Sequence, residues 1–461
     1  MKVSTTKATR CRVPAGKTNG LAASIVCLIL LLLGVDAMPR LQSAAQAEPV
    51  ALLREAARLL ATGHLDEAEP LVRRALDAAP RNSDAHNLLG VVLDQRGRAA
   101  DAEREYRAAL RFNPYSISAR ANLGVLLART KRPDEAIETL EAVLKLAPDH
   151  PQATINLGLL YSTRNDFQRA AVLLGRANEL QPHTFEILQH LAIALYNLKR
   201  LDEAASAFEA ASSLSTNAAE PFYFLGLIAL ARGQQEAAAE LWGKAAALRP
   251  NYPEANFMLG EMLQKHQRFE SARDFYERAL QQDPSRPVYY ARLGGAYIVL
   301  GNFEQALRVF QRAGQRFPED ADMHYFIALA ARGTADYDLA QAALRKSLSL
   351  QPNHVDALAL LGAINSDRGD AATAERLLRR AIAISDKHFN ANRDLGLLLV
   401  RTHRYNEALP ILQHAAALKD NDPDVHYQLF LALSRLKRKE EADREFAIYK
   451  RLTEEQKSKI K

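Results

Sequence analysis

The chain has 461 residues, of which 48% are apolar, 25% charged and 7% aromatic. These proportions are ordinary for a folded protein and exclude a wholly disordered chain, a collagen-like chain or a disulfide scaffold. The formal net charge is +6, but six basic residues and only one acidic residue fall within residues 1–47. The remaining chain is therefore nearly neutral. We expect no nucleic-acid partner, because nucleic-acid-binding proteins carry clustered positive charge on their folded part.

Residues 1–47 have the three parts of a secretory signal peptide. Residues 1–20 contain five basic residues and no acidic one, and the apolar run Leu21–Val35 follows. A small-residue cleavage site could end at Ala37 or at Ala47, and the sequence does not choose between them. A membrane-spanning helix needs about 20 apolar residues, so cleavage is favoured over a membrane anchor formed by residues 21–35. We therefore expect a protein exported to the periplasm or secreted, and otherwise one anchored by this run.

A repeat of 34 residues accounts for residues 49–456 as twelve units without an insertion or a deletion. Position 20 of every unit is alanine: Ala68, Ala102, Ala136, Ala170, Ala204, Ala238, Ala272, Ala306, Ala340, Ala374, Ala408 and Ala442. Position 8 of units 2 to 11 is small: Gly90, Gly124, Gly158, Ala192, Gly226, Gly260, Gly294, Ala328, Gly362 and Gly396. Position 24 is always large and apolar, and most units close with a proline.

Each unit predicts a pair of amphipathic helices, because apolar residues recur at positions 7 and 11 and again at positions 20, 24 and 27. The small residues at positions 8 and 20 allow the two helices to cross closely, and the large residue at position 24 fills the space beside the crossing. Glycines such as Gly97 and Gly301 predict a tight turn between the helices. One such hairpin cannot bury its apolar face alone, so the units must stack into a solenoid.

These units resemble tetratricopeptide repeats over residues 49–456, with the family's Leu-Gly, Ala and Pro positions. The resemblance implies an all-α fold, a right-handed superhelical solenoid of about twelve 34-residue helix-turn-helix repeats. Residues 1–47 would then be a signal peptide or signal anchor, and residues 457–461 a charged C-terminal tail. The charged stretch Lys437–Lys461 is interpreted as a solvated helix that caps the stack, rather than as a basic partner-binding tail.

Catalytic and metal-binding motifs are absent from the sequence. No His-Glu-x-x-His, Gly-x-Ser-x-Gly or EF-hand pattern occurs, and the two cysteines, Cys11 and Cys27, both lie in the leader. The histidines at unit junctions, among them His150, His354 and His388, are interpreted as loop polarity rather than as a ligand set. We therefore expect no enzyme activity, no cofactor and no metal.

The resemblance implies that a partner binds in the concave groove, through positions 2, 5, 6, 9, 12 and 13 of each first helix. The candidate partner-binding residues at these positions form an aromatic middle and a more polar N-terminal part. They are Tyr223, Phe224, Leu227, Phe257, Met258, Arg292, Tyr325, Phe326, Asn122 and Asn156. Positions 5 and 6 also border the interior, so packing between repeats is the alternative role of each aromatic residue.

The favoured function is an exported, non-enzymatic scaffold that binds proteins or peptides in the groove of the superhelix. Contact with a membrane is expected only through an uncleaved leader. One alternative is an accessory subunit of an envelope polysaccharide export or secretion complex, with a glycan in the groove. Another is the repeat portion of a glycosyltransferase system, but the sequence offers no catalytic domain for it. The family's carboxylate clamp is rejected, because position 2 is Glu186, Glu220 or Glu254 where the clamp needs lysine.

Overall fold

The computed structural model describes residues 44–460, which form 24 α-helices and no β-strand. The first helices of the twelve repeats are α1 (Ala44–Ala61), α3 (Ser83–Gln95), α5 (Ile117–Arg129), α7 (Pro151–Thr163), α9 (Phe185–Asn197), α11 (Ala219–Ala231), α13 (Pro253–Lys265), α15 (Pro287–Val299), α17 (Ala321–Gly333), α19 (Val355–Asp367), α21 (Phe389–Arg401) and α23 (Pro423–Arg435). The second helices are α2 (Leu65–Ala78), α4 (Ala99–Phe112), α6 (Pro133–Leu146), α8 (Phe167–Leu180), α10 (Leu201–Leu214), α12 (Gln235–Leu248), α14 (Phe269–Gln282), α16 (Phe303–Arg316), α18 (Tyr337–Leu350), α20 (Ala371–Ile384), α22 (Tyr405–Leu418) and α24 (Lys439–Ile460).

The helices follow the 34-residue register of the sequence. In repeats 2 to 12 the first helix occupies positions 1–13, and in repeats 1 to 11 the second helix occupies positions 17–30. The two ends differ: α1 begins five residues before Pro49, and α24 continues to Ile460, so that most of the predicted tail is helical. The predicted all-α helical repeat solenoid is confirmed.

The predicted leader lies outside the described residues, except for residues 44–47, which form the start of α1. The apolar run Leu21–Val35 and both cysteines fall in the part that is not described. Among the helices within residues 44–460, none combines the length and the apolarity needed to cross a membrane.

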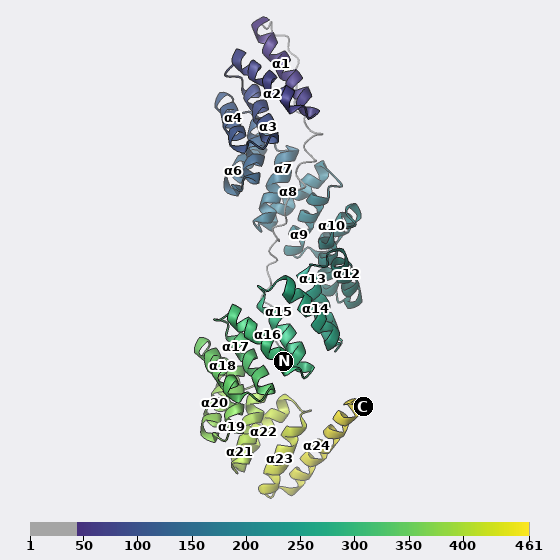
Figure 1. Cartoon of the computed structure of the whole chain (residues 1–461). Coiled ribbons are helices and arrows are strands. Elements are labelled where there is room, and N and C mark those ends of the chain that lie inside the picture. The colour runs from purple at the N-terminus through teal and green to yellow at the C-terminus, as the bar shows by residue number, and fades with distance from the viewer. Residues whose placement is uncertain (1–43, 461) are drawn as a thin grey trace. The chain divides into compact units, whose positions relative to one another are not determined.

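The chain divides into two compact units, Met1–Leu241 and Trp242–Lys461. Within each unit the two helices of a repeat lie side by side, as Figure 1 shows for α3 with α4 and for α19 with α20. Consecutive first helices also touch, for example α5 with α7 and α21 with α23, whereas the described consecutive second helices meet at most at isolated points. Each unit therefore has two helical layers, and the layer of first helices is the more closely spaced.

The core of each repeat lies where its two helices cross. A Cβ atom on Gly90 would lie 2.6 Å from Cε1 of Tyr106, and one on Gly124 would lie 2.7 Å from Cδ2 of Leu140. Tyr106 and Leu140 occupy position 24 and are almost completely buried. Position 8 is thus small because the large side chain at position 24 of the same repeat rests directly on its backbone.

The turn after each first helix has a backbone requirement that extends beyond the glycines. Position 15 has a positive φ in all twelve repeats, and it is Gly63, Gly97, Lys131, Asn165, Lys199, Gly233, Gln267, Gly301, Ala335, Gly369, His403 and Lys437. In the second repeat, Gly97 N–H donates to the carbonyl of Asp94 and Arg98 N–H donates to the carbonyl of Leu93. These two bonds are those of a Schellman motif, which needs a left-handed residue after the helix. The sequence predicts the glycine turns, but the other seven repeats use the same conformation without glycine.

Replacing Ala335 with glycine should stabilise the protein by about 1 kcal/mol, because an L-residue with φ of 59° carries steric strain that glycine does not. Gly301→Ala is the matched control, since Gly301 has φ of 74° and an added Cβ would meet nothing within 4 Å. It should destabilise by a similar amount. Thermal unfolding followed by circular dichroism measures both changes. Equal midpoints for the two variants would contradict the strain argument.

The neighbouring glycines Gly294 and Gly295 in α15 allow a test of the helix crossing. A Cβ on Gly294 would run into the ring of Phe310, whereas one on Gly295 would meet nothing within 4 Å. Gly294→Ala should therefore destabilise the protein by about 1–3 kcal/mol through overpacking. Gly295→Ala should be neutral or stabilising, because alanine is the better helix former. The free energies of unfolding of the two variants, measured in urea, give the comparison; a similar loss in both would refute the packing role of position 8.

Candidate partner-binding surface

The candidate residues of the first unit lie on α11. The ring of Phe224 stacks on Phe208 at 4.9 Å between centroids and meets Tyr196 edge-on at 5.3 Å. Phe224 is only 8% exposed, while Tyr223 and Leu227 are half-buried and pack against the same core. Position 6 of this helix thus contributes to packing between repeats, and position 5 lies nearer the surface.

Positions 5 and 6 of α17 in the second unit are aromatic as well. The ring of Phe326 stacks on Phe310 at 5.2 Å, again a position-6 ring on the position-24 ring of the preceding repeat. Tyr325 lies beside Phe326 at 5.5 Å and beside His354 at 5.2 Å, and it is half-buried. Phe326 thus packs between repeats, and both it and Tyr325 are half-buried against the same core.

Phe257 and Met258 on α13 also belong to the second unit, and both are half-buried. The ring centroid of Phe257 lies 4.9 Å from that of Tyr289 and 5.7 Å from that of Tyr276. The sequence predicts one aromatic strip that starts at Tyr223. In the structure, the aromatic residues on α11 belong to the first unit, and those on α13 and α17 belong to the second unit.

Arg292 on α15 is held by an acidic neighbour. Its Nε lies 2.7 Å from Oε1 of Glu261 and its Nη2 lies 3.1 Å from Oε2, which is a two-pronged ion pair. The hydroxyl of Tyr276 donates to the same Glu261 at 2.6 Å. Burial acts to lower the pKa of Arg292, but its bonds to Glu261 outweigh this effect and hold the pKa above its ordinary value. Arg292 therefore has a carboxylate partner within the protein.

The polar part of the candidate surface lies in the first unit. Asn122 on α5 donates from Nδ2 to Oδ1 of Asn87 at 2.9 Å, and Asn156 on α7 donates to the carbonyl of Gln152 at 2.8 Å. Both asparagines are half-buried. Asn122 thus links two consecutive first helices, whereas Asn156 is bonded within its own helix.

Junction histidines form caps that the sequence analysis missed. Nδ1 of His354 accepts the N–H of Ala357 at the start of α19, so the ring proton is on Nε2, which donates to Asp322 at 3.0 Å. His388 makes the same two bonds at the start of α21, with Asp356 as the acceptor at 3.1 Å. A junction histidine preceded by an acid 32 residues earlier is the sequence signal for this pair.

His150 is the exception among these caps. It accepts the N–H of Ala153 at the start of α7, but the residue 32 positions earlier is Ser118 rather than an acid. Its Nε2 is buried and has no hydrogen-bond partner among the described residues. Burial lowers the pKa of His150 below the ordinary histidine value, because the charged ring would lose its hydration.

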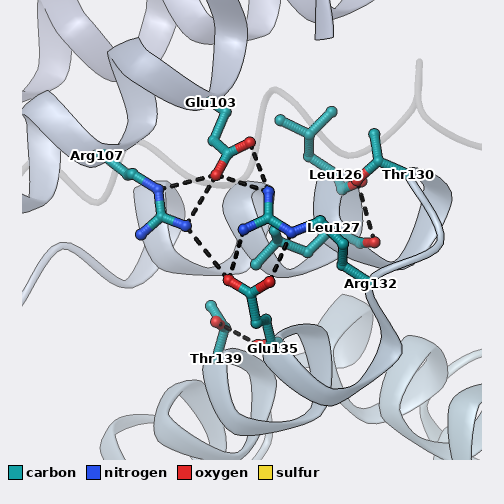
Figure 2. Close-up of polar contacts among 8 residues, drawn as sticks. All are labelled: Glu103, Arg107, Leu126, Leu127, Thr130, Arg132, Glu135 and Thr139. Carbon is teal, nitrogen blue, oxygen red and sulfur yellow. Dashed lines mark hydrogen bonds and ion pairs between the residues drawn. The ribbon is translucent and has the colours of Figure 1, made fainter. Parts of the chain in front are cut away.

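Charged residues also link consecutive repeats along the second helices. In Figure 2, Arg132 lies between Glu103 of the preceding repeat, at 2.8 Å, and Glu135 of its own repeat, at 2.6 Å. Arg107 lies against the same two carboxylates, at 2.8 Å and 3.6 Å. A second network has the same arrangement in the other unit, and its members are Glu375, Arg379, Arg404 and Glu407. These groups satisfy one another, so we assign them to contacts between repeats rather than to a ligand site.

Among the described residues, no three His, Cys, Asp or Glu side chains gather closely enough to hold a metal ion.

Family models described as tetratricopeptide repeat match most of the chain. One matches residues 53–117, 155–219 and 223–287, another residues 93–154, 263–333 and 365–429, and a third residues 321–354. The chain belongs to the tetratricopeptide repeat family. No curated protein has a significantly similar sequence.

Solved structures with the same repeats resemble this tetratricopeptide repeat protein at low identity. The Cut9–Hcn1 hetero-tetramer is 14% identical with a TM-score of 0.46, and the match covers 89% of this chain and 96% of that chain. Yeast Tom70 is 15% identical with a TM-score of 0.38, covering 85% of this chain and 96% of that chain. YrrB, described as a TPR protein with an unusual peptide-binding site, is 22% identical with a TM-score of 0.38, covering 40% and 95%. At these identities the likeness concerns the repeat fold alone.

The buried His150 should make the protein less stable in mild acid. Because its pKa is lowered on folding, the unfolded chain takes up the proton first as the pH falls through the ordinary histidine value of about 6.5. Protonation therefore favours unfolding below this value, and the effect is absent at higher pH. His150→Asn, which keeps a side-chain cap, should lose less stability between pH 7.5 and pH 5. Thermal midpoints at the two pH values measure this, with the exposed His266→Asn as control; an unchanged pH slope in His150→Asn would contradict it.

Proposed function

We propose that this protein is an exported, non-enzymatic scaffold that binds protein or peptide partners on its first helices. Membership of the tetratricopeptide repeat family supports a role in protein–protein interaction. The closer spacing of the first helices supports their exposed side as the concave one, where a partner could contact several repeats at once. The leader pattern in residues 1–47 supports export.

The observation that carries the binding site is a half-buried tyrosine at position 5 that lies beside a stacked ring at position 6, on both α11 and α17. Phe224 and Phe326 are fixed by stacking on the second helix of the preceding repeat, and they in turn support Tyr223 and Tyr325. A tyrosine held by packing loses little side-chain entropy when a partner binds, and it combines an apolar ring with a polar hydroxyl. Tyrosines of this kind are enriched among the residues that dominate binding energy.

The contacts of Arg292 favour an apolar partner residue over an acidic one near α15. A partner carboxylate would have to compete with Glu261, which already occupies both prongs of the guanidinium. By contrast, Phe257 on α13 and Tyr325 on α17 offer aromatic surface. These two are the first helices of the repeats before and after that of α15. We therefore expect apolar or aromatic side chains of the partner at these repeats.

The asparagines of the first unit suit a different kind of partner group. A carboxamide can donate and accept hydrogen bonds at the same time, which matches the amide groups of a peptide main chain. Asn122 and Asn156 are half-buried on neighbouring first helices, so both are positioned within reach of one extended segment. This part would bind with little dependence on the partner's sequence, and the aromatic parts would provide the selectivity.

Capture from envelope extracts, followed by mass spectrometry, should identify a protein partner retained by the purified scaffold. A glycan array with the same protein is the parallel measurement. Binding to defined glycans without any protein partner would contradict the proposal and favour the polysaccharide-export alternative.

Replacing Tyr223 and Tyr325 together with alanine should weaken binding of the captured partner by at least tenfold, since one interface hot spot is worth about 2 kcal/mol. The loss of two half-buried rings should change the thermal midpoint far less than Phe224→Ala, which opens a cavity beside Phe208 at a cost of about 3–5 kcal/mol. Titration calorimetry and circular dichroism provide the two readouts. Unchanged affinity in the double variant would place the binding surface elsewhere.

A further inference from the structure

We propose that the exported chain is cut between Ala47 and Glu48, at the start of α1, rather than after Ala37. This inference rests on the export proposed above and adds the exact processing site. It follows from the burial of Pro49, from the position of Pro49 in its repeat and from the small residues that precede Glu48.

Glu48 and Pro49 lie within α1, near its start at Ala44. The carboxylate of Glu48 lies 3.8 Å from the guanidinium of Arg74 on α2, and its side chain is exposed. Pro49 is the next residue and is already buried, as are Ala56 and Leu60 farther along α1. The peptide bond between Ala47 and Glu48 thus lies just before the buried Pro49.

Pro49 occupies position 1 of its repeat. Four other first helices begin with a proline at this position. The helices α7, α13, α15 and α23 begin at Pro151, Pro253, Pro287 and Pro423. Proline is favoured there because the first residues of a helix need no hydrogen-bond partner for their N–H groups.

In α1 the helix instead continues upstream to Ala44, so Pro49 lies inside it. A proline inside a helix has no N–H to donate to the carbonyl four residues earlier, and its ring crowds that carbonyl, which here belongs to Ala45. The turn at residues 44–48 therefore lacks one backbone hydrogen bond that an uninterrupted helix would have. Removing it would give the first repeat the same start as the four proline-led helices.

The residues before Glu48 have the chemistry of a signal-peptidase substrate. Ala45 and Ala47 are the small residues of an Ala-x-Ala site. In the reaction, water adds to the carbonyl carbon of Ala47 and the bond to the nitrogen of Glu48 breaks. The leader leaves with a carboxylate at Ala47, and the mature chain starts with an ammonium group on Glu48. A cut after Ala37 would instead leave residues 38–47 attached upstream of Pro49.

N-terminal sequencing and intact-mass measurement of the full-length gene product, expressed with its leader and recovered from the envelope or medium, test this site. The expected first residue is Glu48. Ala47→Leu should block processing, because a large residue then stands next to the cut bond. Ala37→Leu is the matched control and should give the same mature chain as the unaltered protein. Circular dichroism of each variant checks that the helical fold is retained.

The possible outcomes separate this inference from the export on which it rests. A mature chain that starts at Met38 would overturn the proposed site while leaving export intact. Envelope protein that retains Met1 would overturn processing but again not export. An intact chain confined to the cytoplasm would overturn both. Mature protein starting at Glu48, together with a block in Ala47→Leu alone, supports the proposal.

Discussion

The fold depends on one close contact that is repeated along the chain, the packing of a position-24 side chain on the backbone at position 8. The ring of Tyr106 lies where a Cβ on Gly90 would have to be, and Leu378 lies in the same way against Gly362. Because no side chain separates the two helices there, their axes can approach closely and exclude water from the crossing. The two-layer form of each repeat is a consequence of this contact.

The position-24 side chain also organises the surface on which we expect partners to bind. In two places it is a phenylalanine, Phe208 or Phe310, that faces the next repeat and stacks on a ring at position 6. One side chain thus joins the two helices of its own repeat and the first helix of the following one. The half-buried rings at position 5, Tyr223 and Tyr325, lie beside this stack. Core packing and binding surface are therefore built from adjacent residues of the same helix.

Electrostatic contacts between repeats add orientation more than stability. Arg368 is paired with Asp338 of the preceding repeat, and Arg132 with Glu103. Arg368 and Asp338 are exposed and Arg132 and Glu103 are half-buried, and an ion pair that water still reaches contributes little net free energy. The His354–Asp322 pair is different, because the histidine is buried and caps α19 through its other ring nitrogen. Such a pair fixes the start of a first helix relative to the helix before it.

The sequence by itself determined the repeat, its 34-residue register and the two helices of each unit. These properties depend on local periodicity and on residue size, as the twelve alanines at position 20 and the small residues at position 8 illustrate. The left-handed turn at position 15 was only partly visible, because Ala335 or Lys199 can be forced into a conformation that their residue type does not indicate.

Only the tertiary structure decided which candidate side chains face inward and which are already engaged. Positions 5 and 6 are adjacent in sequence and similar in composition, yet Phe224 is buried by stacking while Tyr223 remains half-exposed. Arg292 is held by Glu261, which is 31 residues earlier in the chain. Such outcomes depend on the angle and spacing between repeats. The angle and spacing arise from the packing of side chains on different helices, so no local sequence pattern encodes them.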